Sequence, residues 1–149
     1  MDTMTGPPPG ESGWRQLSAG PYMDRIGPLW ARSLDGHWLY GLRANATHLN
    51  PIDVAHGGLL QSLADHAMSL AAWEAAGRVP CLSVDACMQF LAPAQAGDWL
   101  TASARLRHRA GGLVFMQADI HAAARPVLSA MATFKAARPH AARPSSTET

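Results

Sequence analysis

One acidic side chain in the middle of an apolar segment is the residue whose type and position most directly suggest chemistry. Asp65 is the only acid between Asp53 and Glu74, and most of its neighbours are Leu, Ala or Met. A carboxylate buried in such a segment is costly unless it is paired or its pKa rises, and a carboxylate of raised pKa suits general-base catalysis. The alternative is that Asp65 lies on a helix face that the rest of the protein leaves open.

A pair of glycines that precedes Asp65 suggests a second chemical group. Gly57-Gly58 follows His56 at the start of a segment rich in good helix formers. Amides in the first turn of a helix have no partner inside the helix, and they carry the positive end of its dipole. Without side chains in the way, a ligand oxygen can approach these amides as closely as an oxyanion hole requires. A plain glycine entry to a helix is the alternative interpretation.

The spacing of the two groups indicates that they act across two chains. The segment from Gly57 to Asp65 spans about 12 Å along a helix axis, so one chain cannot aim both groups at a single carbonyl. If two such helices run antiparallel across a dimer axis, Asp65 of one chain faces Gly57 of the other. We therefore expect a homodimer with shared sites, and a homotetramer built from two such dimers stays open.

The composition indicates one soluble globular domain. The chain has 149 residues, of which 48% are apolar and 15% charged, and its net charge is +1. This near-balance gives no general electrostatic reason to bind nucleic acid or an anionic membrane. No apolar run reaches the roughly 20 residues of a membrane span, and the first ten residues lack the pattern of a signal peptide. Cys81 and Cys87 lie too far apart on one predicted strand for a disulfide, so we expect free thiols and a cytoplasmic protein.

Other catalytic patterns are missing from the sequence. His66, His108 and His121 lie in no HExxH or HxH pattern and accompany no cysteine cluster, so we expect no metal. No serine occupies a GxSxG elbow, which argues against an ordinary serine hydrolase. No phosphate-binding glycine loop follows Gly57-Gly58, and we expect no bound cofactor.

The elements that must position these residues lie in one predicted domain. We place it at 21–137, between a flexible arm at 1–20 and a flexible tail at 138–149, both rich in residues that do not form a core. Apolar residues occur almost all the way round the segment Leu59–Ala76. This pattern predicts a long buried helix, which Gly77 ends.

Strands make up most of the remaining domain. The later ones alternate apolar and polar residues with a period of two, and we expect them to form a four-stranded antiparallel meander with Gly111-Gly112 as a tight hairpin. A curved antiparallel sheet wrapped around the long helix is the simplest packing, which is the α+β hotdog fold. The expected strands are 37–46, 81–90, 100–107, 113–121 and 127–136, after a short helix within 22–33.

Two stretches resemble the signature of a known enzyme family. The string NPIDVAHGGLLQSLADHA, residues 50–67, joins Asn50, His56-Gly57-Gly58 and Asp65. The string LSVDACMQFLAPAQAGD, residues 82–98, adds a strand and a turn of the same family pattern. Together they resemble the PaaI-like (phenylacetate-degradation type) acyl-CoA thioesterases of the hotdog superfamily, and the resemblance covers nearly the whole predicted domain.

That resemblance implies hydrolysis of an acyl-coenzyme A thioester. By family analogy, the Gly57 amide and the Asn50 side chain polarise the thioester carbonyl, and Asp65 of the other chain activates water or attacks directly. Ser83 would help to hold the nucleophile, while His56 would order the loop or contact the substrate near its sulfur. The thiolate leaves easily, so the reaction demands no strong general acid.

The substrate contacts are expected in the same segments. The candidate substrate-binding residues are Gly58, Leu59, Arg107, Arg109 and Gly112. An apolar lining suggests an aryl or medium-chain acyl group; its members are Leu59, Leu60, Leu63 and Met68. The row Arg105, Arg107 and Arg109 shares one face of its predicted strand, where it could meet the coenzyme A phosphates or form an ordinary solvated surface.

Two points stay open at the level of sequence. The family commonly has glycine three residues before the histidine, where this chain has Asp53, so the loop that carries Asn50 is expected to follow a path of its own. Other functions are also compatible with the pattern. A hotdog hydratase or dehydratase on acyl thioesters would pair Asp65 with His56, and a non-catalytic acyl-CoA-binding module would bind without turnover.

Overall fold

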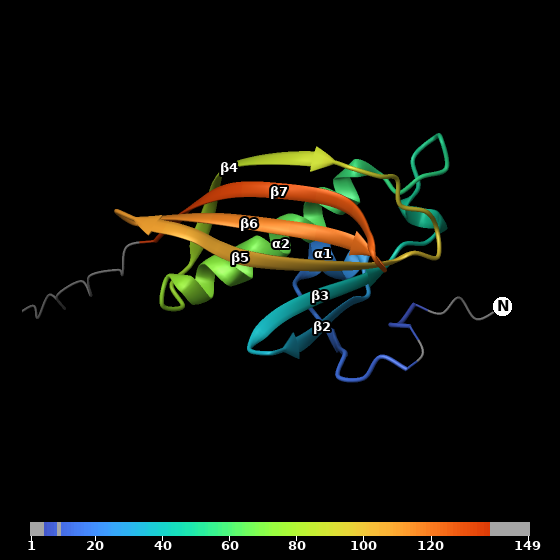
Figure 1. The fold of residues 1–149 in the computed structure, drawn as a ribbon, viewed down its shortest axis with the longest axis horizontal. Coiled ribbons are helices and arrows are strands. Elements are labelled where there is room, and N and C mark those ends of the chain that lie inside the picture. The colour runs from blue at the N-terminus through green and yellow to red at the C-terminus, as the bar shows by residue number, and fades with distance from the viewer. Residues whose placement is uncertain (1–4, 9, 138–149) are drawn as a thin grey trace, which may run out of the picture.

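The computed structural model describes residues 5–8 and 10–137, and in it one antiparallel sheet curves around one long helix, as predicted (Figure 1). The predicted tail at 138–149 lies outside the described residues. No helix in the described ranges is long and apolar enough to cross a membrane. The elements are β1 (Arg15–Leu17), α1 (Pro21–Ile26), β2 (Leu29–Leu34), β3 (His37–Arg43), a 3-10 turn (Ala46–His48), α2 (Gly57–Ala75), β4 (Cys81–Phe90), β5 (Trp99–Ala110), β6 (Leu113–Ala122) and β7 (Arg125–Ala136).

The order of strands differs from the predicted meander at β4. In the described part of the chain the sheet follows the order β1-β2-β3-β5-β6-β7-β4, and all neighbours are antiparallel. β5, β6 and β7 do form a meander, but β4 pairs with β7 at the far edge instead of with β5 (Figure 1). Between β3 and β4 the chain crosses the concave side of the sheet as α2, and β4 begins at the edge beyond β7. The loop after β4 then returns across one end of the sheet and places β5 beside β3.

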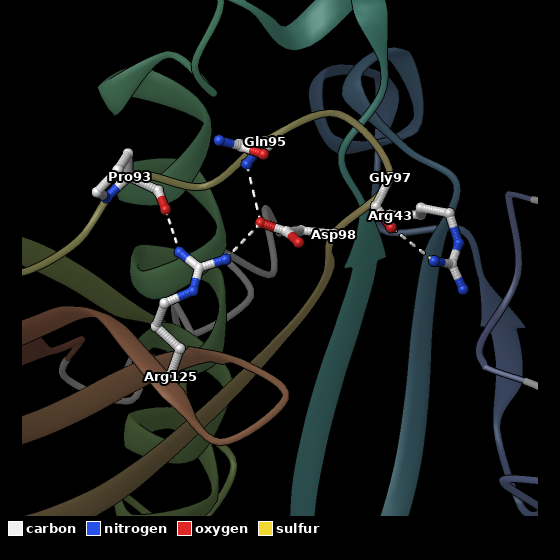
Figure 2. Close-up of polar contacts among 6 residues, drawn as sticks. All are labelled: Arg43, Pro93, Gln95, Gly97, Asp98 and Arg125. Carbon is white, nitrogen blue, oxygen red and sulfur yellow. Dashed lines mark hydrogen bonds and ion pairs between the residues drawn. The ribbon is translucent and has the colours of Figure 1, made fainter.

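Polar contacts fix this return connection between β4 and β5 (Figure 2). Asp98 accepts hydrogen bonds from the Arg125 guanidinium at 2.7 Å and from the Gln95 amide at 2.9 Å. On the other side of the loop, the Arg43 guanidinium donates to the Gly97 carbonyl at 2.8 Å. Because the Arg125–Asp98 ion pair is partly exposed, it adds little net stability, and its main effect is to fix the path of the loop.

α2 buries one side against the sheet and leaves the other open. Its buried side chains are all apolar: Leu59, Leu60, Leu63, Ala64, Ala67, Met68 and Ala72. They pack against the inward-facing side chains of the sheet and form the core of the domain. The expectation of a helix buried all round is therefore wrong, because Gln61, Ser62, Asp65 and Ser69 are at least partly exposed on the opposite side.

The N-terminal part of the chain holds more strand than expected. Inside the predicted arm at 1–20, three residues form β1 and pair with β2, and so short a strand leaves no periodic signal in the sequence. The helix expected within 22–33 is cut short as α1, because Pro28 lacks the amide that a continuing helix would need. The following residues become β2, which pairs with β3 across the tight turn Asp35-Gly36, where both residues have positive φ.

A β-bulge in β4 decides which side chain turns toward α2. The register against β7 shifts between Ser83 and Asp85, which leaves Val84 as the extra residue. A bulge interrupts the strict alternation of faces along a strand. Ser83 therefore lies opposite the fully buried Phe134 and faces the helix, where uninterrupted alternation from Ala86 would have turned it outward.

A second bulge, in β5, separates the three arginines. The register against β6 shifts just after Leu106. Arg105 and Arg107 both donate to the side-chain oxygen of Gln117 on the convex face, at 3.0 and 2.9 Å. Arg109, beyond the bulge, faces the helix and donates to a carbonyl at the C-terminal end of α2 at 2.8 Å. The expectation that the three arginines share one face is therefore wrong.

A tryptophan on the convex face fills the space above a glycine. Trp99 is only 7% exposed, packs edge-to-face with Trp14, and lies under the guanidinium of Arg43. A Cβ atom on Gly41 would lie 2.2 Å from Cζ2 of Trp99, well inside van der Waals contact. Only glycine fits at this position of β3 while Trp99 keeps its place.

We predict that Gly41→Ala lowers the free energy of unfolding by about 1–3 kcal/mol, because the indole of Trp99 must move to admit the methyl group. Chemical denaturation measures this loss. In a Trp99→Phe background the smaller ring leaves room, so the same substitution should cost clearly less. An equal cost in both backgrounds would contradict the proposed contact.

Candidate active site

Asp65 lies on the open side of α2 and lines a cavity of about 390 Å³. The bulge in β4 turns Ser83 toward Asp65, and the Ser83 hydroxyl donates a hydrogen bond to Oδ1 of Asp65 at 3.1 Å. Asp65 is partly exposed, which favours the second interpretation of the sequence, an acid on an open helix face. A carboxylate with one hydroxyl donor keeps further lone pairs for a water molecule or a substrate.

The start of α2 presents an unused amide. The Gly58 amide donates to Nδ1 of His56 at 2.8 Å, and the Leu59 amide donates to the His56 carbonyl at 2.9 Å. The Gly57 amide has no hydrogen-bond partner among the described residues. A Cβ atom on Gly57 would lie 3.2 Å from the Phe90 ring, so a side chain here would crowd Phe90. His56 therefore orders the helix start as its N-cap and leaves the Gly57 amide available to a ligand.

The loop before α2 is organised by Asn50. Its side-chain oxygen accepts hydrogen bonds from the backbone amides of Ile52 and Val54 at 3.0 and 3.3 Å. The backbone amide of Asn50 donates to the Val54 carbonyl at 2.8 Å. Asp53 adopts a φ of 60°, in the left-handed region that favours glycine, although aspartate tolerates it better than most residues. The Asn50 side-chain nitrogen has no partner among the described residues, so it remains a free donor.

Neutral polar side chains that the sequence analysis did not single out complete the cavity. The hydroxyl of Tyr22, on α1, lies 2.7 Å from that of Ser62, which donates to the Gly58 carbonyl at 2.7 Å. Gln61 and Ser69 line the same cavity. The positions 58, 62, 65 and 69 recur at helical spacing, and that periodicity counted from Asp65 is the signal that could have found Ser62 and Ser69.

His66 lies next to this cavity and against the core. Its ring packs edge-to-face on Tyr40 with ring centroids 5.1 Å apart, and its Nε2 atom is buried without a hydrogen-bond partner in the described structure. Burial lowers the pKa of His66, and the neighbouring charge of Asp65 opposes part of that shift. Burial likewise raises the pKa of Tyr40 to about 12. Both rings are therefore neutral near pH 7.

The prediction that four apolar side chains of α2 line the acyl site is wrong, because the core buries them. These side chains are at most 6% exposed and pack into the core between α2 and the sheet: Leu59, Leu60, Leu63 and Met68. They share the helix face that the sheet covers, whereas Asp65 lies on the other side. Met23 and Met88 are the apolar side chains that line the cavity of Asp65.

The residues expected to contact coenzyme A do not assemble around Asp65 within one chain. Arg109 bonds to Ala75, ten residues beyond Asp65 and thus about 15 Å away along the helix axis. Arg107 lies on the convex face, and Gly112 forms the β5–β6 turn with a φ of 82°. Their contact with the substrate stays a prediction.

No group of three or more His, Cys, Asp or Glu side chains in residues 5–8 and 10–137 is arranged to hold a metal ion. Around Asp65 the chain gathers hydroxyl groups, and the amide donors of the helix start lie about 12 Å away along α2. This set can accept a proton from water and donate hydrogen bonds to an oxygen that gains negative charge.

The comparison with known families decides the class of the protein. A family model described as the thioesterase superfamily matches residues 52–129, which include the helix start, Asp65 and Ser83. The chain belongs to the thioesterase superfamily. This membership confirms the predicted class of enzyme, a thioester hydrolase.

Individual members of the superfamily agree with that assignment. A Pseudomonas aeruginosa protein, provisionally named as an esterase, is 32% identical over 116 residues, which cover 76% of this chain and 87% of that protein. The PaaI protein from the phenylacetic acid degradation operon of Escherichia coli is 25% identical with a TM-score of 0.68, over 77% of this chain and 83% of that one. An asparagine-to-aspartate mutant of PaaI from Thermus thermophilus is 25% identical with a TM-score of 0.72, over 79% of this chain and all of that one. The expected hotdog fold and the resemblance to PaaI-like proteins are both confirmed.

We predict that this thioesterase-superfamily protein loses stability as the pH falls below about 6.5, the ordinary histidine value, because the unfolded chain then binds a proton that folded His66 resists. Denaturation at pH 5 and pH 8 measures the loss. His66→Gln should reduce it, while His48, whose pKa burial also lowers, sustains the remainder. Asp65→Asn should deepen it, because the charge that raises the His66 pKa is gone. An unchanged loss in both variants would contradict the assignment.

Proposed function

We propose that the protein is an acyl-CoA thioesterase whose reacting carboxylate is Asp65. The hydrogen bond from Ser83 to Asp65, beside an open cavity, is the observation that carries this proposal. The bond joins two residues that lie on different elements and that the family resemblance had singled out together. Membership in the thioesterase superfamily supports the reaction class, and the resemblance of residues 50–67 to PaaI-like acyl-CoA thioesterases supports coenzyme A as the thiol.

In the proposed reaction, a water molecule adds to the thioester carbonyl carbon while Asp65 takes a proton from it. Negative charge develops on the former carbonyl oxygen, where the Gly57 amide and the Asn50 side-chain nitrogen donate hydrogen bonds. Collapse breaks the carbon–sulfur bond and releases the coenzyme A thiolate and a carboxylic acid. In the second form of the mechanism, the Asp65 carboxylate itself adds to the carbonyl carbon and the carbon–sulfur bond breaks, which releases the coenzyme A thiolate and leaves a mixed anhydride. Water then hydrolyses this anhydride to the carboxylic acid and free Asp65.

We infer that each site is shared between two chains. Gly57 and Asp65 lie about 12 Å apart along α2, too far to act on one carbonyl. β4 forms an edge of the sheet, and its exposed side chains include Leu82 at 70% and Val84 at 58%. An apolar edge strand of this kind invites pairing with a second copy about a two-fold axis. Such pairing would bring the two α2 helices near one another in a homodimer. Two such dimers could in turn assemble into a homotetramer.

The acyl group is proposed to be an aryl or medium-chain group that lies along β4. Met88 lines the cavity of Asp65, and the Phe90 ring lies beside Gly57. Both face the helix at alternate positions of the strand, so they offer one apolar surface next to both reacting groups. This surface replaces the core leucines as the support for an apolar acyl group.

We further propose that the working unit is the domain at 21–137 together with β1, which belongs to the same sheet. The proposed reaction needs only water besides the substrate, so no cofactor enters it. Cys81 and Cys87 are both free, which suits a reducing cytoplasm.

Asp65→Asn should lower kcat by a factor of about 10² or more, because a general base alone supplies about 10²–10⁴ of rate. Free-thiol release from phenylacetyl-CoA, benzoyl-CoA and a series of straight-chain acyl-CoAs measures the effect. Asp85→Asn is the matched control, since that carboxylate accepts from the Thr133 amide at 3.2 Å and lies across the bulge from Ser83. The control should keep full activity.

Each other outcome of this assay points elsewhere. Full activity in Asp65→Asn would remove Asp65 from the mechanism while leaving the fold untouched. Addition of water to an enoyl-CoA without thiol release would identify a hydratase instead. Tight binding of acyl-CoA without turnover of any substrate would identify a binding module.

Gly57→Pro tests the amide donor directly. Position 57 is the first residue of α2, where proline is well tolerated, and His56 has φ −59° and ψ 135°, which suits a residue before proline. The substitution removes the N–H group, so we expect kcat to fall by about 10²–10³, as for loss of one oxyanion donor. Gly57→Ala adds a Cβ atom but keeps the N–H group, and it should retain far more activity.

A mixture of the two inactive variants tests whether the site is shared. A heterodimer of Asp65→Asn and Gly57→Pro chains holds one site with both groups intact, so unfolding and refolding an equimolar mixture should restore about a quarter of the wild-type activity. A site built within one chain would stay inactive in the mixture. Circular dichroism of each variant alone checks that both fold.

A further inference from the structure

The sheet is much wider than the helix that covers it. Seven strands spaced about 4.8 Å apart span roughly 29 Å, whereas an α-helix with its side chains is about 10–12 Å across. α2 packs chiefly on β5 and β6, so the flank formed by β1, β2 and β3 extends beyond it (Figure 1). The concave side of that flank faces the exposed edge of α2.

A groove of about 520 Å³ runs between this flank and α2. Its walls are apolar and mostly aromatic: Leu17, Trp38 and Tyr40 from the sheet, and Leu70 and Trp73 from the helix. Leu70 and Trp73 lie one turn apart on the same helix face. None of these residues lines the cavity of Asp65, so the groove is a separate feature of the surface.

Charged side chains stand at the rim of this apolar groove. Arg15 and Arg78 line it together with Glu74, and all three are exposed. The Arg78 guanidinium lies 5.3 Å from the centre of the Trp73 ring, and its backbone has a φ of 66° in the turn after α2. Neither guanidinium has a hydrogen-bond or ion-pair partner within the described ranges. Two guanidinium groups and one carboxylate therefore line the rim, which leaves it with a net positive charge.

We propose that this groove binds an amphipathic carboxylate, an aliphatic chain that ends in a carboxyl group. The chain would lie against the indole rings of Trp38 and Trp73 and the side chain of Leu70, where it buries apolar surface. The carboxylate would accept hydrogen bonds from Arg15 and Arg78, a pairing that guanidinium groups favour. The groove thus takes a fatty acid, and it does so at a site distinct from the one proposed for hydrolysis.

The test is calorimetric titration of the full chain with decanoate and with decanol, which both have ten carbons and differ in the polar end. Decanoate should bind, and decanol should bind at least about tenfold more weakly, because it cannot use the guanidinium groups. The double variant Arg15→Gln/Arg78→Gln should weaken decanoate to the level of decanol. The matched control Arg25→Gln/Arg32→Gln removes the same charge from outside the groove and should leave the affinity unchanged.

Several results would overturn the proposal, and they are separate from any failure of the hydrolase assay. Equal binding of decanoate and decanol, or an unchanged affinity in Arg15→Gln/Arg78→Gln, would remove the carboxylate site. Tighter binding of decanoate by an Asp65→Asn variant would place the ligand in the hydrolytic cavity, because that substitution removes a like charge there. Leu70→Glu should abolish binding by placing a like charge in the groove. If it instead converts a dimer or tetramer to a smaller species, a second copy of the chain fills the groove.

Discussion

One helix has to close the concave side of a sheet more than twice its width, and most features of this protein follow from that constraint. The side of α2 that meets the sheet carries leucines, alanines and a methionine, and these form the core. The far side of the helix is partly open to solvent in the described structure, with Tyr22 of α1 beside it. It can therefore hold a carboxylate, two serines and a glutamine without burying them in an apolar environment.

Exposed polar groups are useful only if they are held in place, and the backbone around α2 does this. The side chains of His56 and Asn50 accept hydrogen bonds from backbone amides, which orders the helix start and the loop before it. What remains is a pair of donors, the Gly57 amide and the Asn50 side-chain nitrogen, attached to a rigid support. Rigid donors cost little reorganisation when charge develops nearby, which is the property that oxyanion stabilisation requires.

Local periodicity in the sequence predicted most elements, and non-local pairing caused the main errors. The apolar segment before Gly77 and the alternating strands from Cys81 onward lie where they were expected, because their patterns are long. The pairing of β4 with β7 depends on the edge of the sheet at which the chain emerges from α2, and no local sequence pattern indicates that edge. β1 is too short to show a period. Both bulges insert a single residue, which alternation alone cannot reveal.

In the candidate site, the charged residue and the glycine pair stood out in the sequence, and the neutral polar residues did not. Asp65 and Gly57 stand out because an acid in an apolar segment and a glycine pair at a helix start are both unusual. Tyr22 and Ser62 join the same cavity without any such mark. The core leucines were misassigned to the substrate because composition identifies an apolar residue but not the helix side that the sheet covers.

The extra residue in β4 also affects how the role of Ser83 can be assigned in relatives by sequence alignment. Up to Ser83 the odd-numbered residues of this strand face the helix, and from Ala86 onward the even-numbered ones do. A relative with a regular strand would need its hydroxyl one position later to reach the same carboxylate. An alignment without a gap would then pair Ser83 with a residue that points into solvent. The loss of a serine from such an alignment would therefore mark a change in strand geometry rather than a change in catalysis.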